Sequence, residues 1–206
     1  MSLPKRNFKK GFTLVELLVT ITIFVILTGV VLFNQSQFNS TILLTNLAYD
    51  TALTVRQAQT YGINIKGFNG GTQFVPYGAH FETGTNNKSF ILFADILYTD
   101  LDKTAHPYSS ITLSTCDTAK GCVSRYNIQR GNYISKLEVL NSSGVTSTVN
   151  KLDILFQRPN PDALIYGHGS TGTSYVKATI YLTSSDGSRS RRIEVQSNGL
   201  IQIDNS

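Results

Sequence analysis

A long apolar run near the start of the chain predicts a membrane-spanning helix. Residues 12–33 are apolar or uncharged except for Glu16, and they contain no proline. At 1.5 Å per residue, a helix of this length extends about 33 Å, enough to cross the hydrocarbon core of a bilayer. Polar residues 34–37 follow, without the small-residue pair typical of a secretory cleavage site. An ordinary signal peptide therefore fits this segment poorly.

A second helical pattern follows the apolar run. Apolar or small side chains recur at steps of three and four and place one stripe on a single helix face. The stripe consists of Leu44, Leu47, Ala48, Thr51, Ala52, Val55 and Ala58. We expect one helix over residues 12–61, ended by a left-handed glycine cap at Gly62. Residues 34–40 are polar and poor in helix formers, so we expect a local bend or loss of helix there.

After Gly62 the pattern changes to the alternation typical of β strands. The expected strands are residues 90–93, 137–140, 152–156 and 175–182, with a hairpin formed by 193–195 and 200–203. The hairpin turn contains Asn198-Gly199, a strong turn signal. Segments 68–73, 84–89 and 167–174 are rich in Gly, Asn, Thr and Ser and are expected to be loops. These patterns predict an α+β fold in which the apolar helix stripe covers one face of an antiparallel sheet.

The positive charge is concentrated before the apolar run. The net charge is +5, and the first ten residues supply +4 through Lys5, Arg6, Lys9 and Lys10. The other 14 Lys and Arg (18 less these four) face 13 Asp and Glu, so the body of the chain has no general preference for polyanions. The next basic residue after the run is Arg56. The positive-inside rule therefore predicts a cytoplasmic N-terminus, with the residues after about Asn34 outside the cytoplasm.

Glu16 is the unusual residue of the apolar run. A carboxylate five residues into a membrane helix costs about 2 to 3 kcal/mol, so it needs a partner. A simpler interpretation is that the side chain lies near the interface and reaches water.

The segment around this acid resembles a known processing motif. Residues 9–19, Lys-Lys-Gly-Phe-Thr-Leu-Val-Glu-Leu-Leu-Val, are similar to the prepilin motif of type IV pilins and type II secretion pseudopilins. The resemblance implies that prepilin peptidase cuts between Gly11 and Phe12 and methylates the new amine of Phe12. It also implies assembly in which that amine pairs with Glu16 of a neighbouring subunit. A buried pair of this kind sets register more than it adds affinity.

The resemblance also implies a division of the chain into four segments. Residues 1–11 are a basic leader removed on maturation, and 12–33 are the transmembrane and assembly helix. Residues 34–62 are the amphipathic half of the helix, and 63–206 are a β-rich globular domain. We expect a single-pass protein of the inner membrane, its globular domain outside the cytoplasm, which then enters a pilus or pseudopilus.

Residues 47–59 are similar to the helix region of the GspH/FimT kind of minor pilin. Any amphipathic helix packed on a sheet would show the same pattern, so both interpretations stay open.

Cys116 and Cys122 are the two cysteines of the chain. Outside the cytoplasm a disulfide persists, and closing so small a loop stabilises the fold by about 2 to 2.5 kcal/mol. A metal site would need two further ligands, and none lies nearby in the sequence. A local disulfide is the favoured interpretation, with free thiols as the alternative.

Two further motifs match binding sites only superficially. Residues 167–172 form a literal Gly-x-Gly-x-x-Gly, but a β-patterned segment follows where a dinucleotide site needs a helix. Asp95, Asp100 and Asp102 lack the Glu and central Gly of a calcium-binding EF-hand loop. The favoured interpretation of residues 167–172 is a loop, and that of the three aspartates is a solvated turn.

One basic cluster lies in the body of the chain: Arg189, Arg191 and Arg192, with Lys177 expected across the sheet. Some FimT-like minor pilins bind DNA through C-terminal arginines, but three arginines would give weak, salt-sensitive contacts. A solvated strand edge that discourages sheet pairing is favoured, and nucleic-acid binding is not expected.

No enzyme site is expected. His80, His106 and His168 are scattered, and no recognisable nucleophile accompanies them. We name no catalytic residue, metal site or cofactor. The favoured function is a filament subunit whose partners are copies of itself, other pilins and prepilin peptidase. Two alternatives stay open: a minor pilin or pseudopilin of a secretion or DNA-uptake machine, and a membrane-tethered binding domain that forms no filament.

Overall fold

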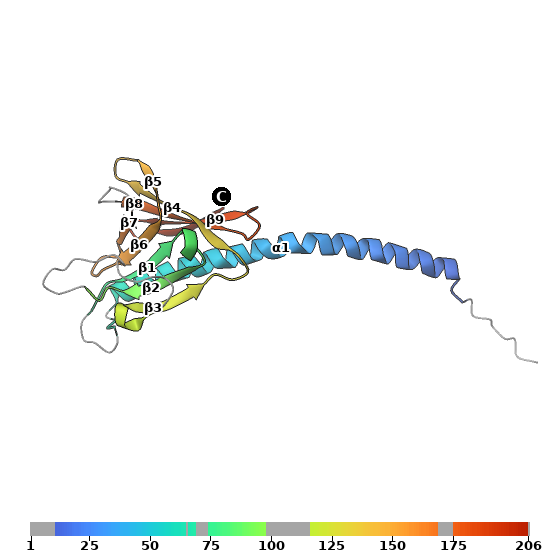
Figure 1. Cartoon of the computed structure of the whole chain (residues 1–206), viewed down its shortest axis with the longest axis horizontal. Helices are drawn as coiled ribbons and strands as arrows, with labels where there is room; N and C mark the ends of the chain where they lie inside the picture. The colour runs from blue at the N-terminus through green and yellow to red at the C-terminus, as the bar shows by residue number, and fades with distance from the viewer. Residues whose placement is uncertain (1–10, 65, 69–73, 98–115, 169–174, 206) are drawn as a thin grey trace, which may run out of the picture. The chain divides into compact units, whose positions relative to one another are not determined.

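The structure is a computed structural model that describes residues 11–64, 66–68, 74–97, 116–168 and 175–205. Over these residues, one long helix is followed by ten strands in two antiparallel sheets (Figure 1). The chain divides into two compact units, residues 1–39 and 40–206. Each unit is described by itself.

Helix α1 (Leu14–Ile63) is continuous through both units, including residues 34–40, where a bend or loss of helix was expected. Its first part contains the apolar segment Leu14–Leu32, which has a mean hydropathy of 2.6 and none of which is buried in the protein. The threonine hydroxyls Thr20, Thr22 and Thr28 donate to helix carbonyls three or four residues earlier, at 2.7–2.9 Å. The hydroxyls are therefore satisfied within the helix, as an apolar environment requires.

The first sheet has the strand order β3-β2-β1-β6-β7 and the second the order β10-β9-β8-β4-β5. The strands of the first sheet are β1 (Tyr77–Glu82), β2 (Ser89–Ala94), β3 (Cys122–Asn127), β6 (Lys151–Phe156) and β7 (Ala163–His168). Those of the second are β4 (Tyr133–Asn141), β5 (Thr146–Val149), β8 (Tyr175–Thr183), β9 (Ser190–Gln196) and β10 (Ile201–Asn205). Two short 3₁₀ turns, η1 (Gly84–Asn86) and η2 (Thr118–Lys120), precede β2 and β3.

All the strands expected from alternation are present, as β2, β4, β6, β8 and the β9–β10 hairpin. Gly199 in the hairpin turn has φ of 82°, the conformation that Asn-Gly turns provide. Strands β1, β3, β5 and β7 were not expected. Strand β1 is buried at every position, although Tyr77, Ala79 and Phe81 alternate with Gly78, His80 and Glu82, while β5 is a short Thr/Ser segment. Strand β7 extends to His168, so the expected loop does not begin at Gly167.

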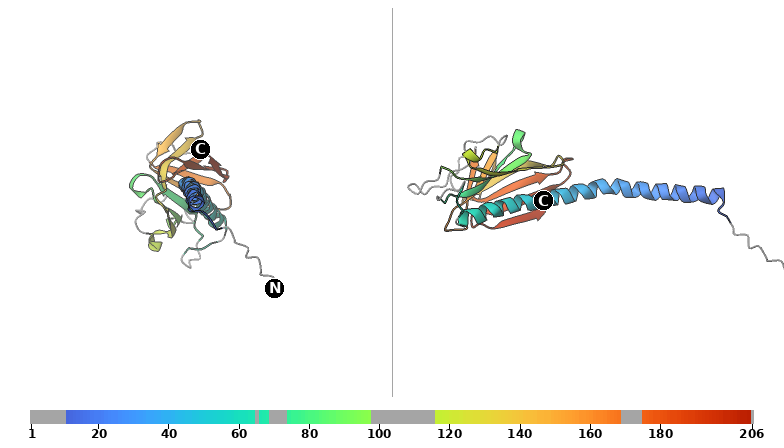
Figure 2. Two further views of the ribbon diagram at one scale, coloured as in Figure 1. Left: turned by 90° about the vertical axis from the view of Figure 1, so that its right-hand side faces the viewer. Right: turned by 90° about the horizontal axis from the view of Figure 1, so that it is seen from below.

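The helix stripe packs against both sheets, whereas the pattern predicted contact with one. Leu44, Leu47, Ala48, Val55 and Ala58 share one buried core with residues of both sheets. Figure 2 shows the cyan part of α1 lying among strands of the two sheets. A single apolar helix face can be buried by two inclined sheets, and the sequence pattern does not distinguish the two cases.

Gly62 is not a left-handed cap, so that prediction is wrong. The residue is helical, buried and without a positive φ, and the helix ends one residue later at Ile63. A Cβ built on Gly62 would collide with the backbone carbonyl of Phe156 in β6. Glycine is therefore required here because the helix approaches β6 closely.

Candidate processing and assembly site

The start of α1 combines a capping threonine with an acid. The hydroxyl oxygen of Thr13 accepts a hydrogen bond from the Glu16 backbone N–H at 3.2 Å, and the Thr13 carbonyl accepts from Leu17 N at 3.1 Å. This is the N-cap half of a Thr-x-x-Glu capping box. Glu16 is the acidic residue of the first turn, where the partial positive charge of the helix favours a carboxylate. The acid thus has a local structural role that the apolar pattern did not reveal, although the Thr-x-x-Glu spacing signals it.

Gly11 has no packing role in the described structure. A Cβ added at this position would meet no atom within 4 Å, and the residue does not adopt a positive φ. It directly precedes Phe12, whose side chain is 74% exposed. The described structure therefore leaves room for a side chain at position 11.

The surface of the first helix segment is apolar and uncovered. Large side chains from Leu14 to Leu32 are 48–78% exposed. Monomeric soluble proteins rarely expose continuous apolar surface of this extent, so this surface needs lipid or other protein around it. The segment has the length and composition of a membrane anchor.

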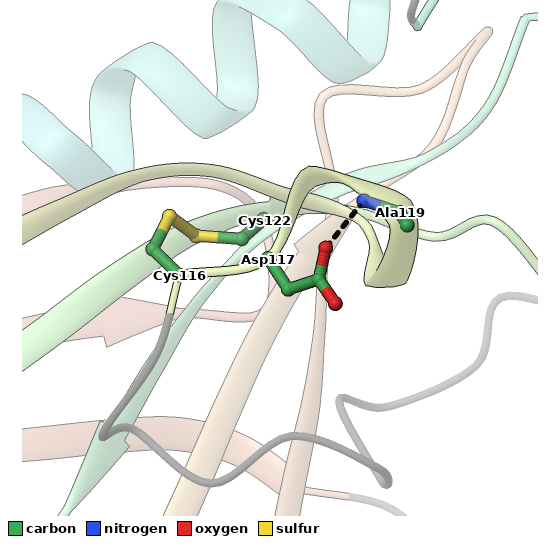
Figure 3. Close-up of a disulfide and its surroundings, with 4 residues drawn as sticks. All are labelled: Cys116, Asp117, Ala119 and Cys122. Carbon is green, nitrogen blue, oxygen red and sulfur yellow. Dashed lines mark hydrogen bonds between the residues drawn. A yellow bond between two sulfur atoms is a disulfide. The ribbon is translucent and has the colours of Figure 1, made fainter.

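The predicted disulfide is present. Cys116 and Cys122 are bonded, with their Cα atoms 5.3 Å apart (Figure 3). Between them, the Asp117 carboxylate accepts from Ala119 N at 2.9 Å and caps the turn η2. Gly121 ends this turn with φ of 89°. The bond holds the residues before β3 to the sheet and has no catalytic context.

The basic cluster is paired with acids on the second sheet. Lys177 Nζ lies 3.2 Å from Glu194 Oε1, and Arg192 forms ion pairs with Glu194 and Asp204. Arg191 instead donates to the Thr45 hydroxyl on α1 at 3.4 Å. Lys177 and Arg192 share Glu194 across β8 and β9, and the carboxylates of Glu194 and Asp204 offset much of the charge of these two residues. A polyanion would have to compete with these pairs.

Two sequence motifs, the aspartates at 95, 100 and 102 and the glycine-rich segment 167–172, lie partly outside the described residues. Asp95 is buried and accepts a hydrogen bond from Leu97 N at 3.0 Å, while Asp100 and Asp102 lie outside the described residues. Gly167 and His168 belong to β7, residues 169–172 lie outside, and β8 follows. In the part of the chain that the structure describes, no group of three His, Cys, Asp or Glu could hold a metal ion.

Two histidines that looked scattered share one carboxylate. His80 and His168 both contact Asp153, at 2.5 and 2.7 Å, while His106 lies outside the described residues. The sequence could not show this, because β1 and β7, which carry the histidines, were not predicted. Leader residues 1–10 likewise lie outside the described part of the chain.

Comparison with known proteins gives one match. The family described as "Prokaryotic N-terminal methylation motif" matches residues 6–32. No curated protein and no solved structure matches the chain. The matched residues include Gly11, Phe12 and Glu16 and most of the exposed apolar helix segment. The match supports the resemblance of this N-terminal segment to the prepilins of the type IV pilin and pseudopilin family.

Proposed function

We propose that the chain is a structural subunit of a type IV pilus or related filament, matured by prepilin peptidase and assembled through residues 12–33. The observation that carries the proposal is the match to the methylation motif over residues 6–32, together with an apolar helix segment that the protein itself does not cover. Members of this family are structural proteins, and the chemistry of maturation belongs to the peptidase.

Processing between Gly11 and Phe12 would change the charge at the helix start. It removes the four basic residues of the leader and creates an amine two residues before α1 begins. A positive amine at a helix N-terminus is unfavourable, and Glu16 in the first turn offsets it. Gly11 has no packing role in the described structure. This supports the proposal that the peptidase needs a small residue directly before the bond that it cuts.

In the filament, Glu16 would pair with the Phe12 amine of a neighbouring copy. Both groups are exposed in the single chain, so each is available to another subunit. In an apolar assembly, an unpaired charge costs several kcal/mol, whereas the matched pair is close to neutral in net stability. The pair would therefore select one axial register between subunits.

The orientation follows the distribution of basic residues. The leader would be cytoplasmic, residues 12–33 would anchor the chain in the inner membrane before assembly, and the β domain would lie outside. A disulfide between Cys116 and Cys122 is consistent with that compartment.

A minor pilin or pseudopilin of a secretion or DNA-uptake machine carries the same N-terminal motif. The likeness of residues 47–59 to the GspH/FimT kind favours this role, while the ion pairs of Lys177 and Arg192 weigh against DNA binding. The other alternative is a membrane-tethered binding domain that forms no filament.

Substitution of Glu16 by Gln tests the assembly proposal. We expect the variant to be made and processed but recovered at least about tenfold less in sheared surface filaments, since a tenfold change corresponds to only 1.4 kcal/mol. The control is Thr13→Val, which removes the cap bond to Glu16 N and keeps the carboxylate. Normal recovery of Glu16→Gln, or an equal loss for both variants, would contradict a role for the charge in subunit pairing.

A further inference from the structure

A buried histidine on β1 lies between two carboxylates. His80 is 1% exposed. Its Nδ1 lies 2.5 Å from Asp153 Oδ1 in β6, and its Nε2 lies 3.1 Å from Glu82 Oε1 on its own strand. Asp153 and Glu82 are themselves 0% and 4% exposed. Both ring nitrogens therefore face an acidic oxygen inside the protein.

The two carboxylates connect His80 to the neighbouring strands. Lys151 Nζ in β6 lies 2.9 Å from Glu82 Oε1, and the Asn86 amide donates to Glu82 Oε2 at 2.6 Å. On the other side, His168 Nε2 in β7 lies 2.7 Å from Asp153 Oδ2. The contacts thus link β1, β6 and β7 through side chains in addition to the backbone ladder.

The protonation state of His80 follows from this geometry. A neutral imidazole carries one N–H and one lone pair, so it can donate to only one of two carboxylates. The lone pair would then face the other carboxylate in a buried place. The imidazolium form donates to both, and charge-assisted hydrogen bonds of this kind are the stronger ones.

The surrounding charges are balanced when His80 is protonated. His80 and Lys151 then oppose Glu82 and Asp153, before His168 is counted. Tyr166 in β7 pairs with Asp153 across the ladder, and burial together with Asp95 and Asp153 raises the pKa of Tyr166, which keeps it neutral. In β3, Arg125 pairs with Ile91, the β2 partner of His80, and donates to Ser89 at 3.1 Å.

We propose that His80, held as an imidazolium between Asp153 and Glu82, is a pH-dependent lock that fastens β1 to β6 and β7. Loss of its proton breaks one buried hydrogen bond and removes the positive charge between the two carboxylates, of which Glu82 keeps its ion pair with Lys151. The first sheet then loosens as the pH rises. In the proposed function, on which this point rests, the β domain lies outside the cytoplasm. It is then exposed to a pH that cytoplasmic buffers do not control.

The directions of the pKa shifts of His80 and Glu82 agree with the proposed lock. Burial by itself would lower the pKa of His80, but the bonds to Asp153 and Glu82 outweigh burial and raise that pKa above the ordinary 6.5. Burial would raise the pKa of Glu82, but His80, Lys151 and Asn86 lower it to about 2. The stabilisation from His80 is complete below 6.5 and is lost as the pH rises through the raised value. That from Glu82 is complete above 4.5 and is lost as the pH falls towards 2.

The experiment uses the full chain in detergent micelles, labelled with ¹⁵N-histidine. The protein has three histidines, so His106→Gln and His168→Gln variants assign the His80 ring signals in a long-range ¹H–¹⁵N spectrum. We expect both His80 nitrogens to be protonated at pH 6.5 and to titrate with a midpoint above 6.5. A midpoint at or below 6.5 would overturn the proposal.

A stability measurement on the same sample tests the consequence. The melting temperature of the wild-type chain should fall by several degrees between pH 6 and the alkaline side of the His80 midpoint. In Glu82→Gln, which removes the negative charge of one of the two acceptors, that alkaline decline should be smaller. His168→Gln keeps both acceptors of His80, so any change in its decline measures the separate contribution of the His168–Asp153 contact. An identical decline in wild type and Glu82→Gln would contradict the lock, and the spectrum decides the outcome if a variant does not fold.

Discussion

The close approach of α1 to β6 depends on a single missing side chain. Gly62 lies against the Phe156 carbonyl, and the helical conformation at this position needs no glycine for itself. Within a helix, glycine is normally disfavoured relative to alanine, so packing outweighs helix propensity here.

Substitution of Gly62 by Ala should therefore destabilise the chain by about 1 to 3 kcal/mol, the usual cost of overpacking a core. Gly29→Ala is the matched control, because a Cβ there meets no atom within 4 Å. Urea unfolding of both variants in the same detergent measures the difference. A Gly62→Ala chain as stable as the Gly29→Ala chain would show that the helix and β6 can separate at little cost.

The amphipathic half of α1 is attached to the β domain by polar contacts as well as by its stripe. The Gln59 amide donates to the carbonyls of Pro161 and Gly199, both at 3.1 Å. Asp50 accepts from the Tyr126 hydroxyl at 2.6 Å. These bonds join the helix to a loop, a hairpin turn and a strand that are far apart in the sequence.

Replacement of Gln59 by Ala should lower the free energy of unfolding by about 1 to 3 kcal/mol, because the buried Gly199 carbonyl and the partly buried bond to the Pro161 carbonyl lose their donor. Gln57→Ala is the control, since Gln57 is exposed and bonds only to the Tyr61 hydroxyl among the contacts described. Thermal unfolding followed by circular dichroism compares the two. Equal stability of the two variants would show that Gln59 contributes nothing beyond its helix propensity.

The disulfide is a second attachment, local to the start of β3. Reduction should destabilise the β domain by about 2 kcal/mol through the loop-entropy effect of the short Cys116–Cys122 ring. Cys116→Ser, at the exposed end of the bond, should reproduce the effect of the reductant and become insensitive to it. A reductant-sensitive melting temperature in Cys116→Ser would mean that the reductant acts elsewhere.

The sequence pattern predicted the elements with strong local signals and missed those defined by distant neighbours. The apolar helix stripe, β8 and the Asn198-Gly199 hairpin are confirmed because their periodicity or turn chemistry is local. Strand β1 was missed although its apolar side chains alternate with Gly78, His80 and Glu82, and β7 was missed because its last residues look like a loop. The contact of His80 with Asp153 requires the register of β1 against β6, which no local pattern gives.

The N-terminal motif was the strongest signal because processing depends on local sequence. Residues 6–32 carry both the family match and the apolar segment, whereas the β domain matches no solved structure. The described structure adds that Gly11 has no steric role and that Thr13 caps the helix at Glu16. For the whole molecule, these features agree with the proposed removal of a leader and the proposed assembly through the helix.

The most direct test is the intact mass of the protein purified from cells with active prepilin peptidase. We predict a chain that begins at Phe12 and carries one added methyl group, and a Gly11→Val variant that keeps its leader while its β domain folds normally. A wild-type chain that still begins at Met1 in those cells would contradict the account.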